Sequence, residues 1–469
     1  MMNLHEAAQA TGGYIIDAGH GEGVRFCGVS TDSRAILPGE LFVALKGDNF
    51  DGYDYLSQAL ERGAVAALVD KSRAQEEETG CRGLPLLAVV DTRRALGDLA
   101  RYWRSRFFLP LIGITGSNGK TTVKEMCAAI LREQARRDGY DAEQSVLATT
   151  GNLNNDIGLP LMLLRLRDTH RAAVIEMGMN HPGEIAYLTR IARPTVALVN
   201  NAQRAHLAGL GSVADVARAK GEIFEGLSEG GVAVINADDP HAGLWCEMNA
   251  KAHRVISFGL EQLADVSAHC ALRKYGSMLR LHTQQGMAGL DLHVLGLHNV
   301  RNALAATAAT LPFATSLDAV AAGLSGYKGM KGRLQLRPAV NGAMLIDDSY
   351  NANPDSVLAA IDVLAATPGK KIFVFGDMGE VGDASGQFHD EIGGYAKSRG
   401  IDRLFGLGDY AATAVRNFDS GAMHFKTPHA LVEALLPLLD ADTTVLVKGS
   451  RFMKMERVTE VIASQDEKK

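Results

Sequence analysis

Residues 116–122 have the types and spacing of a site that binds the phosphate groups of a nucleotide. The segment is Gly-Ser-Asn-Gly-Lys-Thr-Thr, and it follows an apolar run that ends at Ile114. Glycines let backbone N–H groups approach phosphate oxygens, and the first turn of a helix adds partial positive charge. Lys120 can reach the terminal phosphates, and Thr121 can hold Mg²⁺. The predicted nucleotide-binding residues of this loop are Gly116, Ser117, Asn118, Gly119, Lys120, Thr121 and Thr122.

The loop departs from the usual phosphate-loop pattern, which has a glycine six residues before the lysine. Ile114 occupies that position here, and Gly116 lies two residues later. A tight turn from strand to helix, with no ligand, is therefore an alternative interpretation. We favour the phosphate loop because its lysine and threonines lie between a clear apolar strand and the start of a clear helix.

Two further residues lie at the ends of predicted strands, where they can meet the same ligand. Glu176 ends the strand 172–176, and an acid in that position can bind the Mg²⁺ of a nucleotide. His206 follows the strand 195–200 at its C-terminal end, where α/β sheets bind ligands. A solvated strand end for Glu176 and a structural role for His206 remain alternatives. On periodicity alone, Lys220 is an ordinary surface lysine of a helix over 213–227.

Three polar segments have both a binding and a structural interpretation. The cluster 30–34 (Ser-Thr-Asp-Ser-Arg) can hold a phosphorylated or sugar ligand, or form a solvated turn. Residues 150–160 contain Asn152, Asn154 and Asn155, which suit either a polar ligand or a long turn. The Asn and Arg side chains of residues 296–302 can contact a base or ribose, or cap a helix.

The elements that must position these residues form three units along the chain. For residues 1–106 we expect strands at 24–30, 41–45, 65–69 and 84–90 and helices at 55–63 and 92–106. For residues 107–328 we expect strands at 109–114, 172–176, 195–200, 232–236, 254–258, 265–272 and 278–282, and helices from 120, over 213–227 and over 303–309. For residues 329–469 we expect strands at 343–347, 371–375, 403–407 and 444–448 and helices at 355–366, 388–399, 410–418, 429–439 and 453–462.

This alternation of strands and helices predicts an α/β fold with parallel sheets that are covered by helices on both faces. We expect a small α/β domain at 1–106, a central phosphate-loop domain with a mostly parallel sheet at 107–328, and a Rossmann-like, doubly wound domain at 329–469. The glycine-rich segment 328–332 is the predicted hinge between the last two domains. Polar loops end the strands of the third domain at 348–354, 376–380 and 448–451.

Composition excludes several other classes of protein. The chain has 469 residues, 46% of them hydrophobic, and its net charge of −6 comes from interspersed charges of both signs. No basic patch indicates nucleic-acid binding, and no apolar stretch is long enough to cross a membrane. The five cysteines (27, 81, 127, 246 and 270) are scattered and form no Cys-x-x-Cys pair. Free thiols in the cytoplasm are the simplest interpretation.

Taken together and in this order, the motifs resemble those of the Mur ligases over nearly the whole chain. The resemblance rests on residues 115–122, 176–180, Asn201 with His206, Lys220 with Glu222, 298–302, Gly332 with Arg333, and 347–354. It implies an ATP-dependent enzyme that forms an amide bond in peptidoglycan precursor synthesis. Residues 150–156, 376–380 and 447–451 are similar to those of family members that add D-alanyl-D-alanine to UDP-N-acetylmuramoyl-tripeptide.

The resemblance also implies roles for individual residues. It implies catalytic roles for Lys120, Lys220, His206 and Arg333, and a Mg²⁺ site with two expected ions held by Thr121, Glu176, His206 and a carbamoylated Lys220. It implies nucleotide contacts from Asn299, Arg333, Asp347 and Asn351. The implied substrate residues are Ser30, Thr31, Asp32, Ser33 and Arg34 for the uridine diphosphate, Asn152, Asn154 and Asn155 for the muramoyl peptide, and Lys448, Ser450 and Arg451 for the dipeptide.

The implied reaction converts the C-terminal carboxylate of the peptide to an acyl phosphate, which the amine of the dipeptide then attacks. Arg333 of the third domain reaches the site only when the domains close, and closure also excludes water. We expect a monomer that acts on small molecules.

Three alternatives remain at this point. The first is a sister Mur-type or folylpolyglutamate-synthase-like ligase, although the cluster 30–34 favours a sugar nucleotide over a folate. The second is a regulatory nucleotide-binding protein without catalysis, which the combination of Lys120, Glu176, His206 and Lys220 disfavours. The third is a simple phosphate-loop kinase or GTPase, in which the third domain would have no role.

Overall fold

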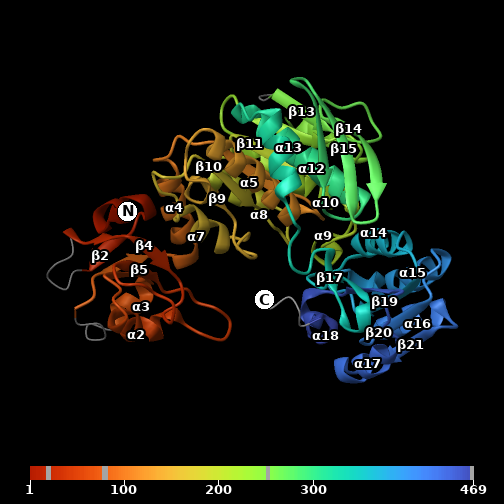
Figure 1. Ribbon diagram of the computed structural model, residues 1–469. Coiled ribbons are helices and arrows are strands. Elements are labelled where there is room, and N and C mark those ends of the chain that lie inside the picture. Colours follow the sequence, from red (N-terminus) through yellow and green to blue (C-terminus); the bar gives the residue numbers. More distant parts are fainter. Residues whose placement is uncertain (17–22, 77–82, 250–253, 465–469) are drawn as a thin grey trace.

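The structure is a computed structural model that describes residues 1–16, 23–76, 83–249 and 254–464. Figure 1 shows three α/β domains, with the central one between the N-terminal domain in red and the C-terminal domain in blue. The predicted three-domain α/β fold is confirmed. Of the cysteines, Cys27, Cys127, Cys246 and Cys270 are free thiols, whereas Cys81 lies outside the described residues.

The N-terminal domain contains a five-stranded sheet in the order β2-β7-β6-β5-β4. Its elements are β1 (Met2–Asn3), α1 (Leu4–Thr11), β2 (Tyr14–Ile16), β3 (Arg25–Phe26), β4 (Gly28–Ser30), β5 (Glu40–Val43), α2 (Leu56–Glu61), β6 (Ala66–Asp70), α3 (Lys71–Glu76), β7 (Leu86–Val89) and α4 (Thr92–Arg104). The predicted strand 24–30 is divided into β3 and β4. Helix α1 is not among the predicted helices, although Asn3 and Glu6 form a capping box at its start.

The central domain is built on a six-stranded parallel sheet in the order β13-β12-β11-β8-β10-β9. Its strands are β8 (Leu111–Thr115), β9 (Val146–Ala148), β10 (Ala172–Glu176), β11 (Val196–Val199), β12 (Val232–Asn236) and β13 (Arg254–Phe258). Every residue of β8 is buried, because helices cover both faces of the sheet. This double coverage explains why the strands are apolar runs rather than alternating patterns.

Helices of the central domain pack on both sides of this sheet. They are α5 (Lys120–Arg137), α6 (Ala142–Ser145), α7 (Gly158–Leu163), α8 (Glu184–Ala192), α9 (Leu207–Leu210), α10 (Val213–Gly221), α11 (Ala242–Asn249), α12 (Leu297–Thr310) and α13 (Leu317–Gly326). Helix α12 begins six residues before the predicted helix 303–309. A separate antiparallel sheet is formed by β14 (Ser267–Arg273), β15 (Gly276–Thr283) and β16 (Gly286–Leu292).

The C-terminal domain has a six-stranded sheet in the order β17-β18-β22-β19-β20-β21. Its elements are β17 (Gln335–Pro338), β18 (Met344–Asp348), α14 (Pro354–Ala365), β19 (Lys370–Gly376), α15 (Ser385–Ser398), β20 (Arg403–Leu407), α16 (Ala411–Phe418), β21 (Ala422–Phe425), α17 (Pro428–Leu435), β22 (Thr443–Lys448) and α18 (Glu456–Ile462). The edge strands β17 and β21 are not among the predicted strands, and only β17 is antiparallel.

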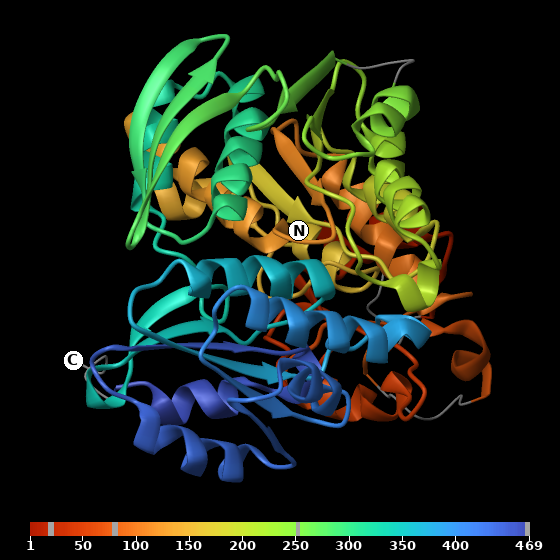
Figure 2. The ribbon, with the colours of Figure 1, turned by 90° about the vertical axis from the view of Figure 1, so that its right-hand side faces the viewer.

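The topology brings the polar loops of two sheets toward each other. In the central sheet β8 lies between β11 and β10, and in the C-terminal sheet β22 lies between β18 and β19. Loops that leave the carboxyl ends of neighbouring parallel strands meet at one edge, where such sheets bind ligands. Figure 2 shows α14 and α15 on the side of the C-terminal domain that faces the central domain. None of the helices in the described residues combines the length and apolar character that crossing a membrane requires.

Candidate functional site

A cavity of about 1260 Å³ lies where these loops meet. It is lined by residues of the phosphate loop, of the ends of β10, β11 and β12, of the start of α12, of the segment just before β17, and of the loops after β18, β19 and β22. Arg93 of the N-terminal domain also reaches it, and Arg93 forms an ion pair with Asp156 of the central domain. All three domains therefore contribute to one cavity that has room for more than one small ligand.

The phosphate loop has the conformation that its glycines predict. Gly119 has a φ of +79°, and a Cβ atom there would lie 2.4 Å from Asn302 Oδ1 and 2.5 Å from Asn200 Nδ2. Helix α5 begins at Lys120, so the first backbone N–H groups of the helix have no partners within it. Lys120 Nζ donates to the carbonyl oxygens of Gly116 at 2.8 Å and Ser117 at 3.4 Å. This arrangement can receive phosphate groups.

The end of β11 supports the loop from the other side. The backbone N–H of Ser117 donates to the carbonyl of Asn201 at 3.0 Å, and the N–H of Asn118 donates to Asn201 Oδ1 at 2.9 Å. Asn200 Nδ2 donates to the Asn118 carbonyl at 2.9 Å. Asn118 also donates to Gln203 Oε1 at 2.6 Å. Asn200 and Gln203 are not among the predicted site residues, although the two consecutive asparagines at the end of a strand are a recognisable signal of such a site.

Thr121 and Glu176 are brought together as predicted. Thr121 Oγ1 donates to Glu176 Oε2 at 2.9 Å, and Asn154 Nδ2 donates to Glu176 Oε1 at 2.7 Å. The Glu176 residue is only 3% exposed. A hydroxyl and a carboxylate that converge beside a phosphate loop suit Mg²⁺, which binds few protein groups and completes its shell with water and phosphate oxygens. The donor set therefore fits one Mg²⁺ ion with a bound nucleotide.

Lys220 is not the surface residue that helical periodicity predicts. The residue is 1% exposed at the end of α10, and it is not among the residues that line the cavity. Burial, together with the charge of Lys120, holds the pKa of Lys220 well below its usual range. A buried lysine with a lowered pKa is uncharged more readily, and an uncharged amine is a nucleophile.

His206 lies at the boundary with the C-terminal domain. Its φ is +58°, and its Nδ1 lies 3.1 Å from Glu380 Oε2. Burial lowers the pKa of His206, and the charges of Lys120 and Lys220 act in the same direction, whereas Glu380 opposes them. The described residues contain no group of three or more His, Cys, Asp or Glu side chains placed to bind a metal. A second metal ion near His206 would therefore need an additional anionic ligand.

The predicted adenosine side of the site lies on α12. Asn299 and Asn302 are both 5% exposed, and Asn302 Nδ2 donates to Asn299 Oδ1 at 3.0 Å. Asn299 Nδ2 donates to the Leu295 carbonyl at 2.7 Å, while Asn200 Nδ2 donates to Asn302 Oδ1 at 3.0 Å. These amides form one buried network with the phosphate loop, so the helix and the loop hold each other in place.

The C-terminal domain supplies cations to the cavity. The guanidinium of Arg333 lies 4.1 Å from the centre of the Tyr350 ring, and that of Arg451 lies 5.6 Å from the same ring. Lys448 Nζ pairs with Asp348 Oδ2 at 2.6 Å and donates to the Asn351 carbonyl at 2.9 Å. Burial lowers the pKa of Lys448, and the Asp348 carboxylate opposes this shift. Arg333, Asn351, Lys448 and Arg451 all line the cavity.

Several predicted site residues lie outside the cavity lining. Asp347 is fully buried, accepts a hydrogen bond from Ser349 Oγ at 2.6 Å and lies 3.4 Å from Arg337, whereas its neighbour Asp348 lines the cavity. Ser450 supports the loop after β19 by accepting from the Gly379 N–H at 2.8 Å. The remaining predicted residues outside the lining are Gly116, Lys220, Ser30, Thr31, Asp32, Ser33 and Arg34.

The cluster 30–34 lies on the N-terminal domain and has the geometry of a turn. The N–H of Arg34 and its Nε both donate to Asp32 Oδ1 at 2.9 Å. These hydrogen bonds lower the pKa of Asp32 to about 2. Ser33 Oγ donates to Gln58 Oε1 at 2.6 Å. The muramoyl-peptide candidates Asn152, Asn154 and Asn155 do line the cavity, and the next residue, Asp156, pairs with Arg93 of this domain.

Comparison with known protein families finds matches over most of the chain. The Mur ligase family catalytic domain matches residues 25–104, the Mur ligase middle domain matches residues 114–310, and the Mur ligase glutamate ligase domain matches residues 332–451. The three matches follow one another in the order of the three domains.

Individual relatives are similar over almost their full length. The chain is 42% identical over 443 residues to the UDP-N-acetylmuramoyl-tripeptide–D-alanyl-D-alanine ligase of Haemophilus influenzae, with 93% of both chains covered. It is also 42% identical to the protein of the same name from Escherichia coli, with 92% of this chain and 93% of that one covered.

Solved structures show the same three-domain arrangement. A crystal structure of MurF from Acinetobacter baumannii superimposes with a TM-score of 0.89 at 36% identity and 98% coverage of both chains. The MurF ligase of Thermotoga maritima in complex with ADP superimposes with a TM-score of 0.79 at 27% identity, with 93% of this chain and 96% of that chain covered.

Proposed function

The chain belongs to the Mur ligase family, and we propose that it joins D-alanyl-D-alanine to UDP-N-acetylmuramoyl-tripeptide in an ATP-dependent step of peptidoglycan precursor synthesis. The main structural support for this function is the phosphate loop, which has Thr121 and Glu176 beside it. The loop lines a cavity that cationic residues of the C-terminal domain also line. In a simple phosphate-loop kinase or GTPase, the third domain would have no role.

The chemistry follows from the poor reactivity of a carboxylate toward amines. The C-terminal carboxylate of the tripeptide attacks the γ-phosphorus of ATP, which forms an acyl phosphate and releases ADP. The amine of the dipeptide then attacks the acyl carbon, the amine loses a proton, and the C–O bond to phosphate breaks. The products are an amide, ADP and inorganic phosphate. Both steps need positioning and charge neutralisation more than a covalent enzyme nucleophile.

The chain's residues can supply that positioning. The phosphate loop and the first turn of α5 bind the phosphates, and Lys120 neutralises charge on the transferred group. Thr121 and Glu176 would hold Mg²⁺, which supplies charge neutralisation and orients the phosphates when it is bound. Asn299, Arg333 and Asn351 would contact the nucleotide. Residues at 150–156 would hold the peptide, and Lys448 and Arg451 the carboxylate of the dipeptide.

We also propose a second Mg²⁺ ion and a carbamate on Lys220 that helps to hold it with His206. The support is the burial of Lys220, its lowered pKa and the absence of an acidic cluster among the described residues. The neutral amine would attack CO₂, form an N–C bond and release a proton, which leaves an anionic carbamate. The modification lengthens the side chain and changes its charge from that of a cation to that of an anion.

The remaining proposals concern organisation and place of action. We propose domain limits of 1–106, 107–328 and 329–469, with sugar-nucleotide, ATP and dipeptide binding assigned to them in that order. The cluster 30–34 would bind the uridine diphosphate, and we propose that the enzyme is a cytoplasmic monomer. Four scattered free thiols among the described residues support a reducing compartment.

The proposed function is tested by measuring phosphate release from Mg²⁺-ATP with UDP-N-acetylmuramoyl-tripeptide, with and without D-alanyl-D-alanine. We expect release that depends on both substrates and a product heavier than the tripeptide by one dipeptide less water. Activity with a single amino acid instead of the dipeptide would identify a sister ligase. No turnover with any acceptor would favour the regulatory alternative.

Gly119 offers a sharp test of the phosphate loop. We expect Gly119→Ala to raise the KM for ATP at least tenfold, because the new Cβ would displace Asn302 and the positive φ costs about 1–2 kcal/mol. Gly139→Ala is the matched control, since Gly139 has a similar φ of +84° with nothing within 4 Å of its Cβ position. Steady-state kinetics and thermal unfolding of both variants would separate the two effects. An unchanged KM for ATP in Gly119→Ala would contradict the assignment.

A further inference from the structure

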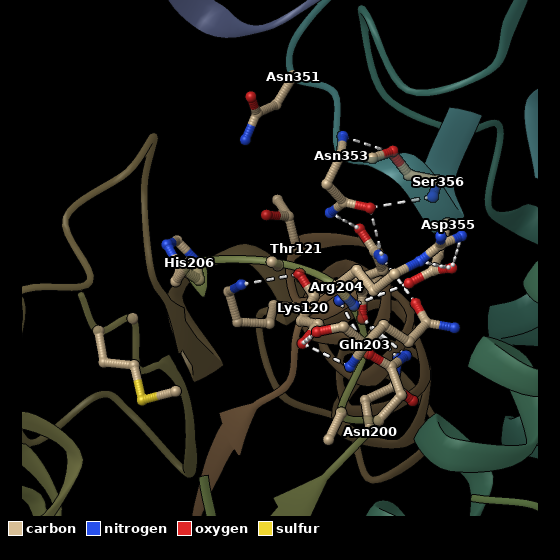
Figure 3. Close-up of a pocket in the computed structure, with 18 of the residues that line it drawn as sticks. Lys120, Thr121, Asn200, Gln203, Arg204, His206, Asn351, Asn353, Asp355 and Ser356 are labelled. Atoms are coloured by element: carbon tan, nitrogen blue, oxygen red, sulfur yellow. Dashed lines mark hydrogen bonds and ion pairs between the residues drawn. The ribbon is translucent and has the colours of Figure 1, made fainter. Parts of the chain in front are cut away.

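One arginine of the central domain joins it to the C-terminal domain beside the phosphate loop. Arg204 Nε and Nη2 donate to Asp355 Oδ1 at 2.9 and 2.7 Å, and the backbone N–H of Arg204 donates to Asp355 Oδ2 at 2.7 Å. Arg204 Nη1 and Nη2 also donate to the two carboxylate oxygens of Glu391, at 2.8 and 3.2 Å. Figure 3 shows the Arg204 side chain directed toward Asp355 at the start of α14.

This contact differs from an ordinary surface ion pair. A guanidinium has five N–H donors in a rigid plane, and those of Arg204 are shared between carboxylates on two helices, α14 and α15. The Arg204 side chain is 25% exposed and stacks 5.3 Å from the centre of the Phe388 ring, also on α15. Exposed ion pairs contribute little to stability, whereas bidentate ion pairs that are partly buried are stronger and fix the relative orientation of the two groups.

A second contact lies next to the first and reaches the phosphate loop itself. Asn353 Nδ2 donates to Asn118 Oδ1 at 2.8 Å, and Asn118 Nδ2 donates to Asn353 Oδ1 at 3.2 Å. Asn353 is also the N-cap of α14, because its Oδ1 accepts from the Ser356 N–H at 3.0 Å. The start of α14 is therefore tied to the phosphate loop through Asn118 and to the end of β11 through Arg204.

We infer that Arg204 is a positioning residue that holds the C-terminal domain against the phosphate loop by binding Asp355 and Glu391. Neither carboxylate has a role in the reaction proposed above. Arg204 lines the cavity with Asp355 and lies between Asn201 and His206, but it is not among the residues predicted to act in catalysis. Because Arg204 binds two helices of the C-terminal domain, it restricts both the distance of that domain from the central domain and its orientation. Arg333, Lys448 and Arg451 share the cavity with Lys120 only while the two domains keep this arrangement.

The kinetic consequence rests on the proposed ligase activity. When the competent arrangement is only partly populated, the apparent dissociation constant of a ligand rises in inverse proportion to that population. We expect Arg204→Met to lower the closed fraction to about one tenth and to raise the apparent KM for both ATP and D-alanyl-D-alanine about tenfold. The reduction in reaction rate should become smaller at high substrate concentration, because ligands that contact both domains restore closure.

Small-angle X-ray scattering of the full chain measures domain opening independently of turnover. With a non-hydrolysable ATP analogue present, Arg204→Met is expected to have a larger radius of gyration than the wild type. The control is Arg190→Met, which removes an exposed ion pair with Glu225 inside the central domain. The control should leave both the radius of gyration and the KM values unchanged. Asp355→Asn should show part of the Arg204→Met effect, since Glu391 still binds Arg204, and the double variant should be no worse than Arg204→Met alone.

The outcomes separate this inference from the proposed function. An active enzyme whose Arg204→Met variant has the scattering and KM values of Arg190→Met would overturn the inference. Additive losses in the double variant would also contradict it, since two residues that act through one contact lose that contact only once. A wild-type chain without ligase activity would refute the proposed function, while its scattering would still report whether Arg204 holds the domains together.

Discussion

Replacing Lys120 with methionine is expected to lower kcat about a thousandfold or more, because the variant loses the cation that neutralises the transferred phosphoryl group. Lys120 Nζ donates hydrogen bonds to the carbonyl oxygens of Gly116 and Ser117, at the position that phosphates would approach. Burial lowers the pKa of Lys120, and the negative charge of bound phosphates would oppose that shift. Methionine is unbranched and only one atom shorter than lysine, so the fold should be retained.

The Lys120 prediction is checked by steady-state kinetics together with thermal unfolding. Lys370→Met is the control. Lys370 forms an exposed ion pair with Asp440 at the amino end of β19, whereas the loop at the carboxyl end of β19 lines the cavity, so Lys370 should be dispensable for activity. Lys120→Arg should recover little, because a planar guanidinium cannot replace a compact ammonium in a tight loop. A Lys120→Met variant within tenfold of the wild type would place the chemistry elsewhere.

The second large effect is expected at Lys220. Lys220→Met should lower kcat about a hundredfold, because the variant cannot form the proposed carbamate and would lose an anionic ligand rather than a cation. Wild-type enzyme prepared without CO₂ should lose activity and recover it when bicarbonate is added. Acidification should act in the same direction as CO₂ removal, since protonation of the amine blocks its reaction with CO₂. Lys370→Met again serves as the control.

A spectroscopic readout distinguishes a carbamate from a merely structural lysine. Incubation with ¹³C-bicarbonate should give a carbamate resonance in the wild type and none in Lys220→Met. In Lys220→Ala, which leaves space, a short carboxylic acid is expected to restore part of the activity, because it supplies the missing carboxylate. An active enzyme without the resonance would show that Lys220 acts as an unmodified, buried amine.

The phosphate loop and most parallel strands were predictable because their signals are local. Gly119 needs a positive φ and has no room for a Cβ. The conformation of the loop therefore requires glycine at this position, and the glycine is visible in the sequence. The strands of the central sheet are buried on both faces, which makes them continuous apolar runs. The pairing of Thr121 with Glu176 then follows from the rule that neighbouring parallel strands end at one edge.

What could not be predicted depends on contacts between distant segments. Helical periodicity does not reveal what packs against Lys220, so a fully buried lysine looks like a surface one. Asp347 and Asp348 are adjacent in sequence, yet only strand register decides that Asp348 faces the cavity. Arg204 meets Asp355 across 151 residues, and no local pattern contains that contact.

Transfer of ¹⁸O from the tripeptide to phosphate is the decisive test of whether the enzyme forms the amide through an acyl phosphate. UDP-N-acetylmuramoyl-tripeptide labelled with ¹⁸O in its C-terminal carboxylate would be incubated with Mg²⁺-ATP and D-alanyl-D-alanine, and the released phosphate analysed by mass. We expect each phosphate to contain one oxygen atom from the labelled carboxylate, with ADP as the other product. Phosphate without ¹⁸O, or formation of AMP, would contradict this mechanism.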